Sequence, residues 1–215
     1  LIIDILNYRS NKNKETNITL SGRKDKDHQT ITINLISLEE ANNKMYSNNL
    51  IIDNNFQLLD FESINLNYID IENKVNRVQF FKKNKDYFLK GKFFNADNLI
   101  ESLFNSDKKK SILLEKNFKI NIDIDEVSLD KKNNLNKFSG NLIFDNQKIF
   151  SANLEGSFSQ SKKLKLTIRN DEENNRITTL YADNAEPIVR RYKFVKGFDE
   201  GELDFYSINN GIESS

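Results

Sequence analysis

The sequence predicts an all-β protein: a predominantly antiparallel sheet, curved or drawn out into an elongated groove, with two or three short helices. Three observations predict this fold. Apolar residues recur at every second position in run after run, clusters of Asn, Asp and Lys separate the runs at hairpin-like spacing, and helical patterns are few and short. The alternation gives each strand one apolar face and one polar face.

The first half of the chain contains the less regular strand patterns. We expect these strands near residues 17–22, 30–36, 49–53, 56–71, 75–82 and 86–94. Between the second and third of them, Ser37 is followed three residues later by Glu40, as in a capping box. This spacing predicts a short helix from Ser37 to about Met45.

The second half alternates more cleanly between Phe118 and Ile168. A register shift of one residue would carry Asp123 and Lys165 to the apolar side, where an uncompensated charge is costly. We therefore expect one continuous apolar face, formed by Phe118, Ile120, Ile122, Ile124, Phe138, Leu142, Phe144, Phe150, Leu154, Phe158, Leu164, Leu166 and Ile168.

The tripeptide Ala-Asp-Asn occurs twice, beginning at Ala96 and at Ala182, each time between a strand pattern and a short amphipathic segment. An Asp side chain can accept hydrogen bonds from the free N–H groups of a helix's first turn, and Pro187 suits an early helical position. We expect Asp97 and Asp183 to cap two short helices. The helices are expected near 97–105 and 184–193, with Leu99, Ile100, Leu103, Ile188, Val189 and Tyr192 facing the strands.

The composition restricts the class of protein. The 32 basic and 32 acidic residues give a formal net charge of zero, whereas a nucleic-acid-binding protein needs a basic surface, so no nucleic-acid partner is expected. Cysteine is absent, which excludes disulfides and thiolate metal sites.

No run approaches the roughly 18 apolar residues of a membrane span. Because the chain begins without Met at Leu1, we expect a fragment of a longer protein, with candidate sub-repeats at 1–95 and 96–215.

Candidate catalytic groups are scarce. His28, the single histidine, lies in a charged hairpin loop by composition. The carboxylates of Asp123, Asp125 and Glu126 could suggest a calcium site, but they lack the EF-hand spacing and glycine and alternate with isoleucines as the polar side of a strand. The lysines at 108–110 could touch lipid headgroups, although a solvated loop is the simpler interpretation. We expect no enzymatic activity, no metal and no cofactor.

The predicted strands each have one apolar face, and the few short helices cannot cover all of these faces. Two architectures could accommodate the uncovered apolar faces. Two sheets can pack face to face in a sandwich, or one curved sheet can keep its apolar face for a ligand. The alternation is compatible with both. The side chains of Phe144, Leu154 and Leu166 would contact an opposing sheet in the first case and line an open concavity in the second.

Several segments carry a resemblance to a known family. The strongest is Ala-Asp-Asn-Ala-Glu-Pro-Ile-Val-Arg-Arg-Tyr at 182–192, followed by Val-Lys-Gly-Phe-Asp-Glu-Gly-Glu-Leu at 195–203. Leu-Lys-Gly-Lys-Phe-Phe-Asn-Ala at 89–96 and Ala-Asn-Leu-Glu-Gly-Ser-Phe at 152–158 add to it. In these segments the chain resembles the AsmA-like family of bacterial envelope proteins, especially its YhdP type, mainly over residues 89–207. Glu186 and Glu200 stand where the family usually shows glycine.

The resemblance implies a long periplasmic protein of a Gram-negative bacterium, anchored in the inner membrane by parts outside this segment. Its repeated strands would form a groove that carries phospholipid between the inner and outer membranes, with acyl chains on the apolar face and headgroups in water at the open edge. The sequence physics agrees with this, because an apolar strip can solvate acyl chains. The alternative is a structural or interaction scaffold built as a β-sandwich in an envelope or surface protein.

Overall fold

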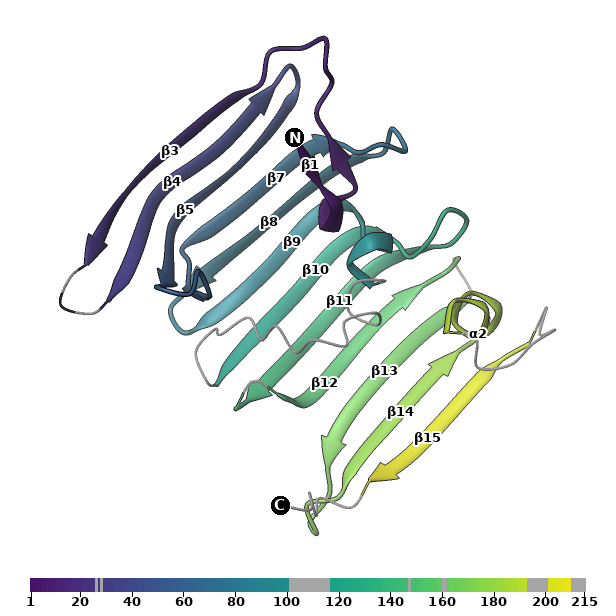
Figure 1. Cartoon of the computed structure of the whole chain (residues 1–215). Coiled ribbons are helices and arrows are strands. Elements are labelled where there is room, and N and C mark those ends of the chain that lie inside the picture. Colours follow the sequence, from purple (N-terminus) through teal and green to yellow (C-terminus); the bar gives the residue numbers. More distant parts are fainter. Residues whose placement is uncertain are drawn as a thin grey trace.

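The computed structural model describes residues 1–25, 27, 29–100, 117–146, 148–159, 162–192 and 201–209, except for the side chains of Ile5 and residues 190–192. These residues form one large curved sheet of 13 strands and a separate two-stranded sheet (Figure 1). The predicted all-β fold with short helices is confirmed. The strands are β1 (Ile2–Ile3), β2 (Tyr8–Arg9), β3 (Asn17–Asp25), β4 (Thr30–Glu40), β5 (Asn43–Asp53), β6 (Leu58–Asp60), β7 (Ser63–Ile69), β8 (Val75–Lys83), β9 (Asp86–Asn95), β10 (Phe118–Ser128), β11 (Asn134–Asp145), β12 (Lys148–Ser157), β13 (Lys163–Asn170), β14 (Arg176–Ala182) and β15 (Leu203–Asn209).

The strands of the large sheet follow one another in chain order from β3 at one edge to β15 at the other, with β6 beside β5. Neighbours are antiparallel except β9 and β10, which are parallel. A parallel pair requires a crossover connection, which here runs over residues 96–117. The break in strand direction therefore lies at the boundary between the candidate sub-repeats 1–95 and 96–215.

Three hairpin loops are held by the same arrangement, in which an aspartate side chain binds backbone N–H groups of its own loop. The carboxylates of Asp53, Asp70 and Asp171 each accept hydrogen bonds from the backbone N–H groups two and four residues later. In each loop the third residue after the aspartate has a positive φ, which Asn tolerates better than most residues. These residues are Phe56, Asn73 and Asn174, with φ of 61°, 62° and 62°. The aspartates thus fix where three strand pairs turn, and through the turns they help to fix the register.

The helix predicted from Ser37 to Met45 is wrong, because these residues form the hairpin between β4 and β5. Glu40 pairs with Asn43 across a two-residue turn in which Ala41 has a φ of 50°. Leu38 and Met45 are cross-strand partners and both are buried. Their burial in the sheet outweighs the capping-box signal, since local helix propensity is a weak preference that tertiary packing overrides.

The N-terminal segment lies on the front face of the sheet in Figure 1, where β1 and β2 are joined by the short helix η1 (Asp4–Leu6). Tyr8 is buried among Leu38, Met45 and Tyr68. The hydroxyl of Tyr68 donates to the backbone carbonyl of Leu6 at 2.8 Å. These contacts attach the segment to β4, β5 and β7 and cover one end of their apolar face.

Glu40 is the polar anchor of this contact. Its buried carboxylate accepts hydrogen bonds from the Tyr8 hydroxyl at 2.9 Å, the Asn11 N–H at 2.7 Å, the Thr16 hydroxyl at 3.2 Å and the Asn43 amide at 3.3 Å. Burial alone would raise the pKa of Glu40, but these hydrogen bonds outweigh burial and hold the pKa below its ordinary value. Burial, reinforced by Glu40, raises the pKa of Tyr8 to about 12.

Short helices follow β9 and β14, as predicted. The first is helical over residues 97–100, and α2 spans Glu186–Tyr192. Both lie near strand ends in front of the sheet in Figure 1. The predicted strand-facing residues that the structure describes are packed against the core or buried: Leu99, Ile100, Ile188 and Val189. Leu103 and the side chain of Tyr192 lie outside the described residues.

The predicted cap of the first helix is displaced by one residue. The N–H of Ile100 donates to the carbonyl of Ala96 at 2.9 Å, so Ala96 is the flanking residue and Asp97 is the first helical one. The side chain of Asn95 accepts from the Asp97 N–H at 3.3 Å. Asn95, the last residue of β9, therefore contacts the first turn through its side chain.

The prediction that Asp183 caps α2 is wrong. Asp183 lies three residues before the helix, and its carboxylate accepts from the backbone N–H of Lys163 at 2.8 Å and from the Tyr181 hydroxyl. These hydrogen bonds, from Tyr181 first, hold the pKa of Asp183 below its usual range. Asp183 therefore ties the end of β14 to the start of β13.

A buried polar network holds the strand ends beside the parallel pair. The Asp70 carboxylate accepts from the side-chain amides of Asn76 at 3.2 Å and Asn95 at 2.8 Å, and the Asn95 N–H donates to the Asn76 side chain at 2.7 Å. Ser128, at the end of β10, accepts from the Lys74 ammonium at 2.9 Å. Asn76, Asn95 and Ser128 are fully buried. The network joins the ends of β7, β8, β9 and β10 where β9 leaves the sheet.

Candidate functional site

One row of apolar side chains crosses the whole large sheet. Residues directly opposite each other in a ladder point to the same face, so the observed register defines rows that run across the strands. Following these partners from β3 to β15 gives the apolar row: Leu20, Ile36, Ser47, Ile64, Phe80, Leu89, Ile122, Gly140, Leu154, Leu166, Leu180 and Phe205. Every strand on the path from edge to edge contributes one member.

The two members without a large apolar side chain do not place a charge in the row. The Ser47 hydroxyl donates to the Ser63 carbonyl at 2.7 Å, so its polar group is satisfied within the sheet. Gly140 has a φ of 138°, and a Cβ at this position would stand 2.0 Å from the carbonyl oxygen of Asn153. The backbone therefore approaches too closely for any other residue. With strands about 4.8 Å apart, the apolar row is roughly 50 Å long.

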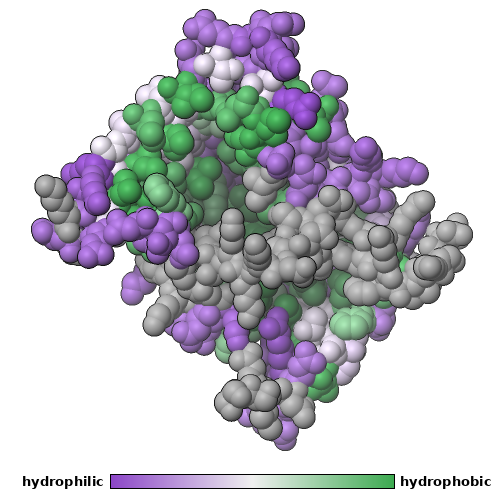
Figure 2. All heavy atoms as spheres, in the orientation of Figure 1, coloured by the Kyte–Doolittle hydropathy of each residue, from purple (hydrophilic) through white to green (hydrophobic). Residues whose placement is uncertain are grey.

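Exposure changes along the apolar row. In the middle, Ile122 and Leu154 are 8% and 9% exposed. At the two edges, Leu20 is 66% exposed and Phe205 is 47% exposed. Ile36, next to Leu20, is also exposed. Figure 2 shows apolar side chains gathered in a hollow over the N-terminal strands. The row is therefore closed to water in its centre and open at both ends.

The residues predicted to share the second-half apolar face largely do so by register. Cross-strand partners connect Phe118, Ile120, Ile122, Ile124, Phe138, Leu142, Phe144, Leu154, Leu164, Leu166 and Ile168 through Gly140, Ala152 and Gly156. Phe150 lies at a register shift in β12 and is exposed. Phe158 follows β12 in a turn, yet it packs against the same face beside Leu135 and Leu164.

A cluster of aromatic rings adjoins the apolar row. Phe118 stacks on Phe144 with ring centroids 4.4 Å apart, and Tyr87 meets Phe118 edge to face at 5.7 Å. The Tyr87 hydroxyl and the Lys82 ammonium both donate to Asp60, at 2.7 Å and 2.8 Å. Burial alone would raise the pKa of Asp60, but these hydrogen bonds, led by that from Lys82, lower it. The rings are thus fixed by packing and by a charged anchor.

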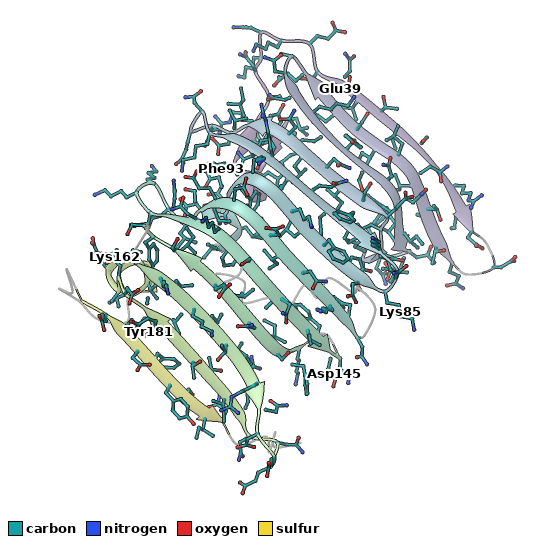
Figure 3. All side chains as sticks on the ribbon, turned by 180° about the vertical axis from the view of Figure 1, so that it is seen from behind. Glu39, Lys85, Phe93, Asp145, Lys162 and Tyr181 are labelled. Atoms are coloured by element: carbon teal, nitrogen blue, oxygen red, sulfur yellow. The ribbon has the colours of Figure 1, made fainter. Side chains whose placement is uncertain are left out.

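Figure 3 looks at the opposite face of the sheet, which a row of mostly polar side chains crosses. The row next to the apolar row consists of Thr19, Ser37, Tyr46, Asn65, Gln79, Lys90, Asp123, Ser139, Glu155, Lys165, Tyr181 and Asp204. Asp123 and Asp125 form ion pairs with Lys90 at 3.7 Å and Lys92 at 2.8 Å. Their carboxylates therefore belong to a solvated, charge-balanced face, as the alternation indicates.

The described residues contain no group of three or more His, Asp and Glu side chains placed to hold a metal ion. Among them, no helix is long and apolar enough to cross a membrane. His28 and the lysines at 108–110 lie outside the described residues. Within the part of the chain that the structure describes, the feature with the clearest potential function is the apolar row.

Sequence reasoning missed the N-terminal half of this row, and it also missed Leu180 and Phe205 at the other end. Leu20, Ile36, Ile64, Phe80 and Leu89 continue it across β3, β4, β7, β8 and β9. A signal was present, because the strands expected near 17–22, 30–36, 56–71, 75–82 and 86–94 contain all five of these residues. Which strand pairs with which, and in what register, decides whether such residues align, and the alternation alone does not specify that.

Comparison with known proteins adds no relative: no protein family, no curated protein and no solved structure matches this chain.

Proposed function

We propose that this protein is a non-enzymatic lipid-carrying segment, in which the apolar row and its flanking apolar side chains hold the acyl chains of phospholipids. The observation that supports this most strongly is the continuity of the row from one sheet edge to the other, with exposed members at both ends. A row that served only a closed core would have no need of large exposed apolar side chains at the two edges, where they cost solvation free energy.

The physics of the row suits lipid that moves. Covering an acyl chain recovers about 0.8 kcal/mol per buried methylene, so even partial cover holds a chain. Because the row repeats similar apolar side chains on every strand except β5 and β11, where Ser47 and Gly140 stand, sliding by one strand replaces most contacts with equivalent ones. The row is open to water at both edges of the sheet, so a headgroup can stay in water there while its tails follow the row.

The cellular setting is part of the proposal and rests on the resemblance to AsmA-like envelope proteins. In that setting the segment lies in the periplasm of a Gram-negative bacterium, within a longer protein anchored in the inner membrane. Its cargo is phospholipid that passes between the inner and outer membranes. Membrane contact occurs through parts outside the segment.

A second candidate function is a scaffold that binds other proteins through its edges. The observation that favours it is the exposure of apolar side chains on the edge strand β15, where Phe205, Tyr206 and Ile208 are all exposed. The β-sandwich form of this alternative is not seen among the described residues, because the sheet that packs on the large one has just the two short strands β1 and β2. A scaffold function would use the edges and leave the apolar row without a lipid ligand.

A lipid-uptake assay separates the two functions. The purified chain is incubated with vesicles that contain fluorescent phospholipid, and lipid that co-elutes with protein is measured after gel filtration. The double variant L20D/I36D places two charges at the open end of the apolar row. The matched control T19D/S37D places the same charges on the same two strands, at adjacent positions on the opposite face.

Lipid carriage predicts that L20D/I36D takes up severalfold less lipid, while T19D/S37D matches the unmodified protein. Both variants should keep the β-sheet circular-dichroism spectrum, because all four positions lie on β3 and β4 near the sheet edge. No uptake by the unmodified protein, or equal loss in both variants, would leave the scaffold as the better explanation.

A further inference from the structure

The polar face contains a shallow trough that the apolar row does not explain. It has a volume of about 580 Å³ and crosses β5, β7, β8, β9 and β10. Tyr46, Asn65, Asn67, Arg77 and Gln79 line it. A register shift at Arg77 and Val78, opposite Phe93 and Gly91, lies on β8 and β9 in the middle of the trough. Such irregularities bend a sheet locally, which accounts for a hollow on an otherwise even polar face.

Each basic side chain that lines the trough forms an ion pair with a carboxylate, except one. Lys44 pairs with Glu39 at 2.8 Å, and the ammonium groups of Lys90 and Lys92 pair with Asp123 and Asp125. Arg77 is exposed and has no ion-pair partner among the described residues. The trough therefore presents one uncompensated guanidinium near its centre, a group whose planar fork matches a carboxylate with two parallel hydrogen bonds.

The groups around Arg77 are hydrogen-bonding amides and one aromatic ring. Asn67 is the cross-strand neighbour of Arg77, Asn65 lies between Tyr46 and Gln79, and these side chains form two adjacent rows. No hydrogen bond from another described side chain engages the amides of Asn67 or Gln79, which are exposed. Amides that both donate and accept suit ligand hydroxyls. The Lys44 ammonium lies over the Tyr46 ring, 5.9 Å from its centroid, and the remaining surface of the ring can contact the C–H groups of a sugar ring.

We propose that this trough binds an extended acidic oligosaccharide, with one uronic-acid carboxylate on Arg77, hydroxyls on the amides and a sugar ring against Tyr46. The charge pattern argues against nucleic acid, because Asp123 and Asp125 stand at one end and balance two of the cations. A neutral glycan would leave the guanidinium of Arg77 without a partner. The proposal is independent of lipid carriage, since the trough and the apolar row lie on opposite faces of the sheet.

The test is a titration of the protein with tetragalacturonate, followed by calorimetry. The variant R77Q keeps a hydrogen-bonding side chain but removes the charge and should weaken binding about tenfold or more, as expected for loss of a hydrogen bond between charged groups. Y46L removes the ring and should weaken binding severalfold. The matched control is R169Q, which removes an exposed arginine on β13, three strands beyond β10, and should bind as the unmodified protein does.

Two ligand controls complete the design. A neutral galacto-oligosaccharide of the same length should bind at least severalfold more weakly than tetragalacturonate, and inorganic phosphate should compete poorly. The proposal is overturned if tetragalacturonate does not bind, if R169Q loses as much affinity as R77Q, or if phosphate displaces the sugar at equal concentration. Thermal melts of R77Q and Y46L, checked against the unmodified protein, separate loss of a contact from loss of the fold.

Discussion

The middle and the two ends of the apolar row contain the same kinds of side chain in opposite environments. Ile122 and Leu154 lie in a buried cluster with Val78, whereas Leu20 and Phe205 are exposed at the edges. In the middle, an apolar residue stabilises the fold. At the ends it contributes little to stability, and the proposed lipid function would account for its apolar character there. Substitutions in the middle of the row therefore test the stability of the fold, whereas substitutions at its ends can test ligand binding.

The largest expected effect is in the middle of the row. The substitution L154D places a carboxylate in a buried apolar cluster, and the cost should exceed about 4 kcal/mol, because the charge loses hydration without gaining a partner. Urea unfolding monitored by circular dichroism should show a lost or strongly shifted transition. A stability equal to that of an edge variant would mean that the centre of the row is wetter than its burial indicates. Because folding is affected here, this position cannot test for lipid.

A second comparison uses two hairpins with the same aspartate loop. Asp70 holds its own turn and also accepts from the buried amides of Asn76 and Asn95, whereas Asp171 is engaged mainly within its own turn. D70A should therefore lower the free energy of unfolding by about 3 kcal/mol and D171A should lower it less, since buried amides left unsatisfied add to the loss of the turn. Urea denaturation measures both. Equal losses would show that the network beside β9 and β10 adds nothing.

The contact of the N-terminal segment with the sheet should depend on pH. The folded pKa of Glu40 lies below its ordinary value of 4.5, so its stabilising contribution is present above that pH and is lost as the pH falls through the folded pKa. E40Q should cost about 1 kcal/mol at neutral pH and should lose less stability than the unmodified protein as the pH falls from neutral to below 4.5. Melting temperatures across that range test it. If the melting temperatures of E40Q and of the unmodified protein fell in parallel with pH, Glu40 would not be the source of the pH dependence.

The smallest expected effect is at the open end of the row. L20D should change the free energy of unfolding by no more than about 0.5 kcal/mol, because the side chain is already mostly in water. The same urea titration used for L154D gives the comparison directly. A loss of several kcal/mol would show that Leu20 is buried in solution, and the distinction between the ends and the middle would fail.

Much of the fold could be predicted from the sequence because side-chain alternation is a local signal. The strands from Phe118 to Asn170 and the two short helices after β9 and β14 follow from it. The error at Ser37 to Met45 has a physical reason. A capping box competes there with a strand pair whose burial depends on Tyr8, and Tyr8 lies about thirty residues earlier in the chain.

The two Ala-Asp-Asn copies show where local similarity stops being informative. At the first copy Asp97 is helical, whereas at the second Asp183 binds the neighbouring strand and α2 begins later. The first copy precedes a parallel strand and the second precedes an antiparallel one. The tripeptide is the same, but strand pairing decides its role. For the same reason the sequence predicted Ile122, Leu154 and Leu166 of the apolar row and could not predict its continuation to β3 at one edge and to β15 at the other.

The central claim is that the apolar row takes up acyl chains at both of its ends, and site-specific quenching tests it most directly. The chain has no cysteine, so single cysteines can be introduced at Leu20 and Phe205, with Thr19 and Asp204 as controls at adjacent positions on the opposite face. Each is labelled with a fluorophore and mixed with phospholipid brominated in its acyl chains. We expect strong quenching at positions 20 and 205 and little at 19 and 204. Equal quenching on both faces, or none at 20 and 205, would contradict lipid binding along the row.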